Sequence, residues 1–141
     1  MTGQPRELGR LFVYGSLRSD APRERAGAKR AFAMLEAGAE LEGRATIAGR
    51  LYAPSWYPGF APGDGGQVTG EVWRILDPDL LVRLDAYEGD GYVREQREVV
   101  PVAGALDGLG VTAWVYRYVA DIAGVSEIAS RDYLGWVRNP G

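Results

Sequence analysis

The chain contains no cysteine, no histidine and a single lysine, Lys29, among its 141 residues. Without cysteine there are no disulfides, thiol nucleophiles or thiolate metal ligands. Without histidine there is no Ser-His triad or imidazole base, and nearly every structural zinc site is excluded. We therefore expect no metal and no cofactor. An enzyme of this composition would use Asp or Glu, aided by Tyr, to move protons.

Three other features are scarce. No apolar run approaches the roughly 18 residues of a membrane span, so we expect no membrane association. The net charge, 16 − 19 = −3, argues against a nucleic-acid partner. The polar N-terminus, residues 1–9, lacks the apolar region of a signal peptide, which predicts a cytoplasmic protein with a disordered leader.

What is present favours one domain, which we place at residues 10–141. Hydrophobic residues make up 46% of the chain, which is enough to bury a core. Glycine numbers 20, about twice its usual share of roughly 7%, and this indicates many turns, bulges or close backbone approaches.

The distribution of apolar and turn residues predicts an α+β fold with a small, strongly curved sheet or barrel. Strands are expected at residues 10–14, 43–53, 67–76, 92–102 and 111–119, with a bulge at Gly49. Loops are expected at residues 54–66 and 103–110. Helices are expected within 22–37, over 77–88 and after Ser130, with capping signals at Ser19–Pro22, at Asp77-Pro78 and at Ser130 itself.

The first candidate site is Tyr14-Gly15-Ser16-Leu17, directly after a buried strand. A strand that stops at Gly-Ser leaves several backbone N–H groups free, and such a group of amides binds a carboxylate or a developing oxyanion. The alternative is an ordinary turn that ends the strand.

Glu88 is the second candidate, because it follows Leu81 and Leu84 at helical spacing and so shares their apolar face. Burial of an unpaired carboxylate is expensive, and it raises the pKa toward values useful for acid–base catalysis. Alternatively, Glu88 swings out to solvent or pairs with one of the many arginines. Asp85, three residues earlier, is a candidate partner of Glu88 or a cap for the next segment.

Aromatic residues form the third candidate. Trp114, Tyr116 and Tyr118 share one strand face, which serves either core packing or a pocket reached by a tyrosine hydroxyl. The aromatic residues of the 54–66 loop either line a pocket or plug the end of a barrel. Four cationic residues form a basic helix face that we interpret as solvated: Arg23, Arg25, Lys29 and Arg30.

Taken together, these motifs resemble the γ-glutamyl cyclotransferase family over residues 10–137. A YGSL string alone is a weak signal, but one followed about seventy residues later by LDxxEG and then YxR is fairly specific. The residues that carry the resemblance are Tyr14-Gly15-Ser16-Leu17-Arg18, Gly49-Arg50-Leu51-Tyr52, Tyr57-Pro58-Gly59, Gly70-Glu71-Val72, Leu84-Asp85-Ala86-Tyr87-Glu88-Gly89, Tyr92-Val93-Arg94 and Ala113-Trp114-Val115-Tyr116.

The resemblance implies a small mixed β-barrel with short flanking helices, acting on a small-molecule γ-glutamyl substrate as a monomer or homodimer. The substrate's own α-amino group would attack its γ-carbonyl and release 5-oxoproline and a free amine. By similarity to the family, Glu88 is the acid–base group and the backbone of residues 14–17 binds substrate. The family also implies that Tyr116 faces the pocket.

Two other classes of protein stay open from the sequence. One is a non-catalytic module that binds a small ligand in the same pocket. The other is a structural or oligomerisation domain, which would leave both Glu88 and the residues 14–17 without an explanation.

Overall fold

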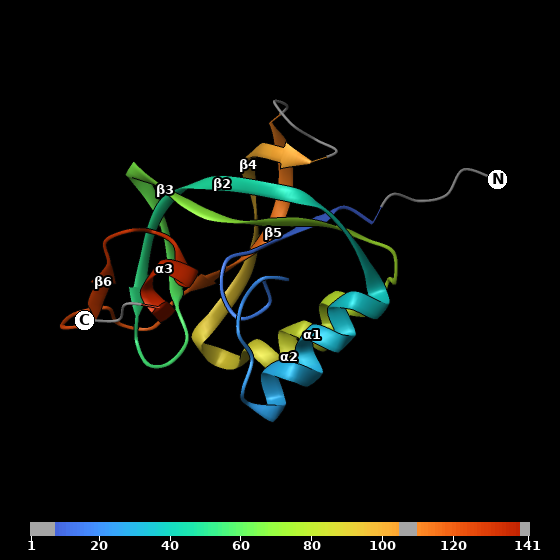
Figure 1. Cartoon of the computed structure of the whole chain (residues 1–141), viewed down its shortest axis with the longest axis horizontal. Helices are drawn as coiled ribbons and strands as arrows, with labels where there is room; N and C mark the ends of the chain where they lie inside the picture. The colour runs from blue at the N-terminus through green and yellow to red at the C-terminus, as the bar shows by residue number, and fades with distance from the viewer. Residues whose placement is uncertain (1–7, 105–109, 139–141) are drawn as a thin grey trace.

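The computed structural model describes residues 8–104 and 110–138 and has a mixed β-barrel flanked by helices (Figure 1). This confirms the predicted α+β barrel class. The elements in chain order are β1 (Arg10–Val13), α1 (Ala26–Gly38), β2 (Ala39–Ala53), β3 (Gly59–Ile75), α2 (Leu80–Glu88), the 3₁₀ turn η1 (Gly89–Gly91), β4 (Tyr92–Gly104), β5 (Val111–Tyr118), β6 (Ser126–Ile128) and α3 (Tyr133–Arg138).

Five strands close the barrel in the order β1, β3, β2, β4, β5 and back to β1. Neighbours in this order are antiparallel except β5 and β1, which run parallel. β3 also meets β5 in parallel, where Phe60 pairs with Arg117. Leu11 is paired with Trp73 of β3 on one side and with Trp114 of β5 on the other. β1 is therefore enclosed by two strands, as predicted, although it ends at Val13.

β1 separates two apolar cores, which explains why its sequence is apolar throughout instead of alternating. Phe12 faces the barrel interior, while Leu11 and Val13 face a second core. In this second core, α1 and α2 lie side by side and cover one side of the barrel (Figure 1). The end of β1 consequently lies where the barrel meets its helices.

The signal at Ser19–Pro22 predicts a helix start that is wrong by four residues, because α1 begins at Ala26. Both capping side chains have other partners. The Ser19 hydroxyl donates to Glu71, and Asp20 accepts two hydrogen bonds from Arg18 at 3.0 Å.

The other two helices also begin later than the capping signals predict. α2 begins at Leu80, although the Asp77 carboxylate still accepts the N–H of Asp79 at 2.9 Å. Ser130 does not cap α3. Instead, the carboxylate of Asp132 accepts the N–H of Leu134 at 3.0 Å, which is the usual capping contact.

The predicted loop at 54–66 is wrong beyond Pro58, because β3 already begins at Gly59 and pairs with β2. The predicted bulge at Gly49 is confirmed, since the register shifts between Ala48 and Gly49. Opposite this shift, residues 63–66 have no partner on β2. The Gly-rich segment is therefore an insertion within a strand rather than a connection between strands.

The ends of other predicted segments fall partly outside the described residues. The predicted turn 103–110 begins within β4, and residues 105–109 lie outside the description, as do residues 1–7 of the predicted leader. Leu8 packs against the second core, and the carbonyl of Gly9 accepts the N–H of Ile75 at 3.0 Å. Among the described residues, no helix combines the length and the apolar character that a membrane span requires.

Candidate active site

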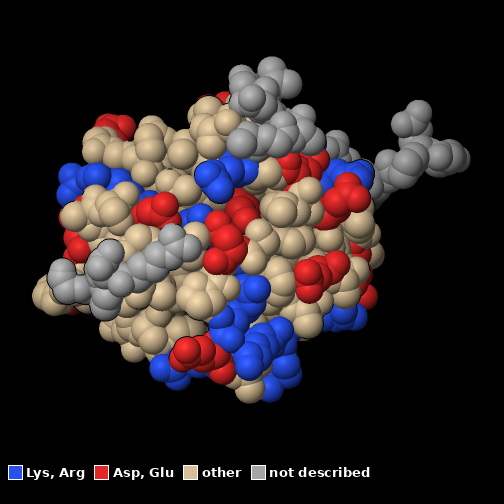
Figure 2. Space-filling view, viewed as in Figure 1, with Lys and Arg blue, Asp and Glu red and all other residues tan. Residues whose placement is uncertain are grey.

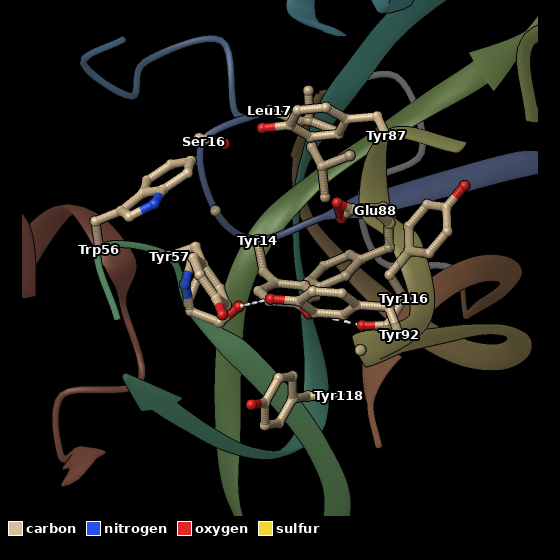
Figure 3. A pocket seen from close by; sticks show the side chains of 15 residues that line it. Tyr14, Ser16, Leu17, Trp56, Tyr57, Tyr87, Glu88, Tyr92, Tyr116 and Tyr118 are labelled. Carbon is tan, nitrogen blue, oxygen red and sulfur yellow. Dashed lines mark hydrogen bonds between the residues drawn. The ribbon is translucent and has the colours of Figure 1, made fainter. Parts of the chain in front are cut away.

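A cavity of about 320 Å³ lies at the end of β1, beside the C-terminus of α2 (Figure 3). The six residues to which the family resemblance assigns a role lie on its wall: Tyr14, Gly15, Ser16, Leu17, Glu88 and Tyr116. The other lining residues are Phe12, Val13, Trp56, Tyr57, Pro58, Tyr87, Gly91, Tyr92 and Tyr118. The fold thus brings together groups that are about seventy or more residues apart in the chain.

The turn after β1 presents backbone amides without an acceptor among residues 8–104 and 110–138. Three of its carbonyls are occupied: Gly15 accepts the N–H of Arg18 at 3.0 Å, and Arg23 donates to the carbonyls of Ser16 at 3.1 Å and Arg18 at 2.7 Å. Within the described part of the chain, no protein acceptor is found for the N–H groups of Gly15, Ser16 and Leu17. This arrangement favours an anion-binding group of amides over an ordinary turn.

Two buried charged side chains hold this turn in place. Glu71 is 6% exposed and accepts the Ser19 N–H at 2.7 Å as well as the Ser19 hydroxyl. Arg18 is 2% exposed and binds the carboxylates of Asp20 and Asp132. Sequence reasoning missed both roles, because Arg and Glu are expected at the surface and nothing local signals their burial.

Gly15 allows the turn to contact Pro58 closely. A Cβ atom at position 15 would lie 2.7 Å from Pro58 Cγ and 3.0 Å from Cδ. We expect Gly15→Ala to lower the free energy of unfolding by about 1–3 kcal/mol in urea denaturation, because the proline ring must move. Gly27→Ala is the matched control, since its Cβ would meet only Tyr87 and Arg30 at ordinary distances of 3.8 and 3.9 Å. Equal stability of the Gly15→Ala variant and the wild type would refute this packing argument.

Glu88 is the last residue of α2. Its predicted position on the buried face of this helix is confirmed, but one of the leucines assigned to that face is different. Leu80 and Leu84 are fully buried, whereas Leu81 only packs at the margin of the core. Glu88 follows Leu84 by one turn and stays on the buried face. Among the described residues its carboxylate has no hydrogen bond and no ion pair. No arginine of ranges 8–104 and 110–138 is therefore its partner.

The surroundings of Glu88 favour its protonated form. Burial, followed by the negative charge of Asp85, raises the pKa of Glu88 from 4.5 to about 7. The side chain keeps partial contact with the cavity, so it is accessible to a ligand. A carboxylate with this pKa can both accept and donate a proton near neutral pH. Within the described residues, no three Asp or Glu side chains lie where they could share a metal ion.

One interpretation of the sequence made Asp85 a partner of Glu88, but the two carboxylates are not hydrogen-bonded to each other. Its carboxylate accepts two hydrogen bonds from Arg94, at 2.8 and 3.0 Å, and one from the Tyr116 hydroxyl at 2.7 Å. The hydrogen bonds from Arg94 are the main reason that the pKa of Asp85 is lowered. Asp85 therefore stays ionised one helical turn before Glu88. Tyr116 contributes its ring to the cavity while its hydroxyl is held by Asp85.

Three tyrosine hydroxyls of the aromatic wall, including that of Tyr116, are hydrogen-bonded to the protein. The Tyr14 hydroxyl donates to the Tyr116 carbonyl at 2.6 Å and accepts the N–H of Phe60 at 3.2 Å. The Tyr92 hydroxyl donates to the Pro58 carbonyl at 2.6 Å (Figure 3). Any contact of Tyr14 with a ligand is thus made by its ring or backbone.

The aromatic segment 54–60 serves both purposes that the sequence left open. Trp56 and Tyr57 line the cavity, whereas Phe60 is fully buried inside the barrel. Of the three aromatic residues predicted to share a face of β5, Tyr116 and Tyr118 reach the cavity and Trp114 does not.

The raised pKa of Glu88 has a consequence for stability. Between pH 4.5 and about 7 the folded chain binds more protons at this site than the unfolded chain. The free energy of unfolding is therefore highest below pH 4.5 and decreases as the pH rises to about 7. We expect ionisation of Glu88 to lower the free energy of unfolding by about 2 kcal/mol as the pH rises through this range, after allowance for its contact with solvent. Urea denaturation of the wild type and Glu88→Gln at pH 5 and pH 8 measures it. Parallel pH dependence of the two proteins would refute it.

The fold and the cavity define a small barrel protein whose cavity brings together backbone amides and one carboxylate that have no partner in the described part of the chain. A family model described as "Gamma-glutamyl cyclotransferase, AIG2-like" matches residues 11–135. The match spans most of the chain, and the protein belongs to this family. The resemblance seen in the sequence motifs is therefore confirmed.

Solved structures share this fold. Protein PH0828 from Pyrococcus horikoshii is 24% identical, with 92% of each chain covered and a TM-score of 0.64. An AIG2-like protein from Mus musculus is also 24% identical, with 79% of this chain and 77% of that chain covered and a TM-score of 0.64. Protein ytfP from Escherichia coli is 34% identical, with 89% of this chain and 96% of that chain covered and a TM-score of 0.61. A search of curated proteins gave no significant match.

Proposed function

We propose that the protein is a γ-glutamyl cyclotransferase that converts an L-γ-glutamyl amine or amino acid into 5-oxoproline and the free amine. One observation carries this proposal: three backbone amides without acceptors and one carboxylate without a partner, among the residues described, line the same cavity. A γ-glutamyl group has the complementary charges, since its α-carboxylate suits the amides and its α-ammonium suits Glu88.

The reaction needs no nucleophile from the protein. Glu88 takes a proton from the substrate's α-ammonium, and the resulting amine attacks the γ-carbonyl carbon of the same molecule. A C–N bond forms within the five-membered ring, and the bond to the leaving nitrogen breaks as Glu88 returns the proton to that nitrogen. The ring nitrogen gives up its second proton to the departing amine, which leaves as an ammonium, so that atoms and charge balance. Holding the two reacting atoms in contact can supply several orders of magnitude in rate.

The acid–base properties of the site support this step. An α-ammonium in a model peptide has a pKa near 8, and a carboxylate of ordinary pKa near 4.3 would be a weak base for it. With its pKa raised to about 7, Glu88 is much closer to its proton donor. The ammonium of a bound substrate will lower this value, so the pKa of Glu88 should differ between the free and the liganded protein.

Product analysis tests the proposal. Purified protein is incubated with L-γ-glutamyl-L-alanine, L-γ-glutamyl-ethylamide and the D-γ-glutamyl isomer of the first compound. We expect equimolar 5-oxoproline and free amine from at least one L-substrate and none from the D-isomer. Saturable binding of the L-substrates without any 5-oxoproline would contradict the proposal and favour the non-catalytic binding module.

A further inference from the structure

A positively charged side chain borders the cavity where α1 begins. The Arg25 guanidinium carbon lies 4.3 Å from the centroid of the Trp56 ring, and Trp56 is both a lining residue and 36% exposed. The Trp56 carbonyl is bound by the Tyr133 hydroxyl at 3.3 Å, which holds this residue in place. Tyr87, another lining residue, lies next to Gly27 of α1. Arg25 is therefore located at the rim.

Arg25 differs from the two preceding arginines, because no hydrogen bond or ion pair joins its side chain to another described residue. Its charge lies close enough to the Tyr133 hydroxyl to oppose the rise in the pKa of that tyrosine. Arg18 binds two carboxylates, while Arg23 donates to two carbonyls and lies 3.6 Å from the centroid of the Phe32 ring. Stacking on Trp56 restrains the guanidinium of Arg25 and leaves its N–H donors available. A planar fork of this kind matches a carboxylate.

Charge around the cavity is distributed unevenly. Residues 22–35 carry four cationic side chains and one carboxylate, Glu24. Figure 2 shows Lys and Arg gathered near the start of α1, at the lower edge of the view. Among the lining residues that the structure describes, Glu88 is the only one with a charged side chain, and it is an acid. A second carboxylate of the substrate, in addition to the one proposed to bind the amides of residues 15–17, would meet positive charge at the rim.

We propose that Arg25 selects substrates whose leaving amine carries a carboxylate, so that γ-glutamyl amino acids are used in preference to γ-glutamyl alkylamines. This inference rests on the proposed function and names its substrate class. Arg25 acts on specificity alone, because it lies at the rim and takes no part in the transfer of protons at Glu88.

Two substrates of matched shape test the selection. L-γ-Glutamyl-L-alanine and L-γ-glutamyl-L-alaninamide differ only in the leaving-group carboxylate. For the wild type we expect kcat/KM to be about threefold to fivefold higher with the carboxylate, as for one ion pair with an exposed arginine. Arg25→Gln should remove this preference by lowering kcat/KM for the carboxylate substrate alone. Lys29→Gln, which removes the same charge one helical turn further on, should leave both values unchanged.

The outcomes separate the inference from the proposed function. If the wild type releases 5-oxoproline from neither substrate, the proposed function fails and the inference fails with it. If the wild type converts both with equal kcat/KM, the function stands and the selection is refuted. An equal loss of kcat/KM for both substrates in Arg25→Gln also refutes the selection, because the effect would then concern the γ-glutamyl group that both substrates share.

Discussion

Replacing Glu88 with glutamine is expected to lower kcat for 5-oxoproline release by about 1,000-fold, which is typical for the loss of a general acid–base group. Glutamine keeps the shape of the side chain but carries no proton between the α-nitrogen and the leaving nitrogen. The chain has no His or Cys that could take over this role. Substrate affinity should fall by no more than about tenfold, because the charge beside the α-ammonium is lost while the amides proposed to bind the α-carboxylate are untouched.

Two measurements keep this result interpretable. A thermal melt of Glu88→Gln should show a folded protein, since the substitution removes a buried charge rather than a packed group. Asp90→Asn is the control, because Asp90 is an exposed carboxylate two residues further on. If Glu88→Gln turns over at a rate close to that of the wild type, Glu88 is not the acid–base group and the mechanism fails.

Replacing Glu71 with alanine should cause the second large effect, a loss of about 3 kcal/mol in the free energy of unfolding. Ser19 would lose both acceptors of its hydrogen bonds, and the Trp73 indole would lose an acceptor at 3.3 Å. Because Glu71 holds the turn that carries the free amides, KM should rise roughly tenfold, as for a loss of about 1.4 kcal/mol in binding. The change in kcat should be small, since Glu71 does not line the cavity.

Urea denaturation and steady-state kinetics measure both parts of this prediction. Glu36→Ala serves as the control, because Glu36 is an exposed carboxylate on α1. Glu71→Gln keeps one acceptor oxygen and should fall between the wild type and Glu71→Ala in both stability and KM. A Glu71→Ala variant with unchanged KM would show that the turn holds its shape without the buried carboxylate.

The parts of the fold that the sequence predicted are those with a local pattern. The apolar run at 10–14 indicated a buried strand because β1 faces a core on both sides. Gly49 was recognised as a bulge because an interior glycine in a strand pattern is a local signal, and a Cβ there would lie 2.4 Å from the Ala61 carbonyl oxygen. The predicted strands and the barrel class followed from such signals.

What the sequence could not predict depends on distant partners. β6 has three residues and forms only because Leu51–Ala53 offers a free edge. Arg18 is buried against Asp132, which lies 114 positions later in the chain. The hydrogen bond from Tyr116 to Asp85 spans 31 positions. No local pattern reports contacts of this kind.

The candidate site was predictable only in those parts that have a local sequence pattern. Glu88 stood out because a carboxylate on an apolar helix face is unusual. The prediction placed Leu81 on this face, whereas the structure buries Leu80 instead. The helix has only nine residues, so two neighbouring assignments of its buried face fit the sequence almost equally well. Arg25 was interpreted as part of a solvated face, because its proximity to Trp56 exists only in the folded chain.

The central claim is that one substrate bridges the amides of residues 15–17 and the side chain of residue 88. A crystal structure of Glu88→Gln soaked with L-γ-glutamyl-L-alanine tests this most directly. We predict the α-carboxylate within hydrogen-bonding distance of those amides. We also predict the α-nitrogen beside the substituted side chain at position 88, at about 3–3.5 Å from the γ-carbonyl carbon. A ligand bound in an extended conformation, or with its α-nitrogen away from residue 88, would contradict the account.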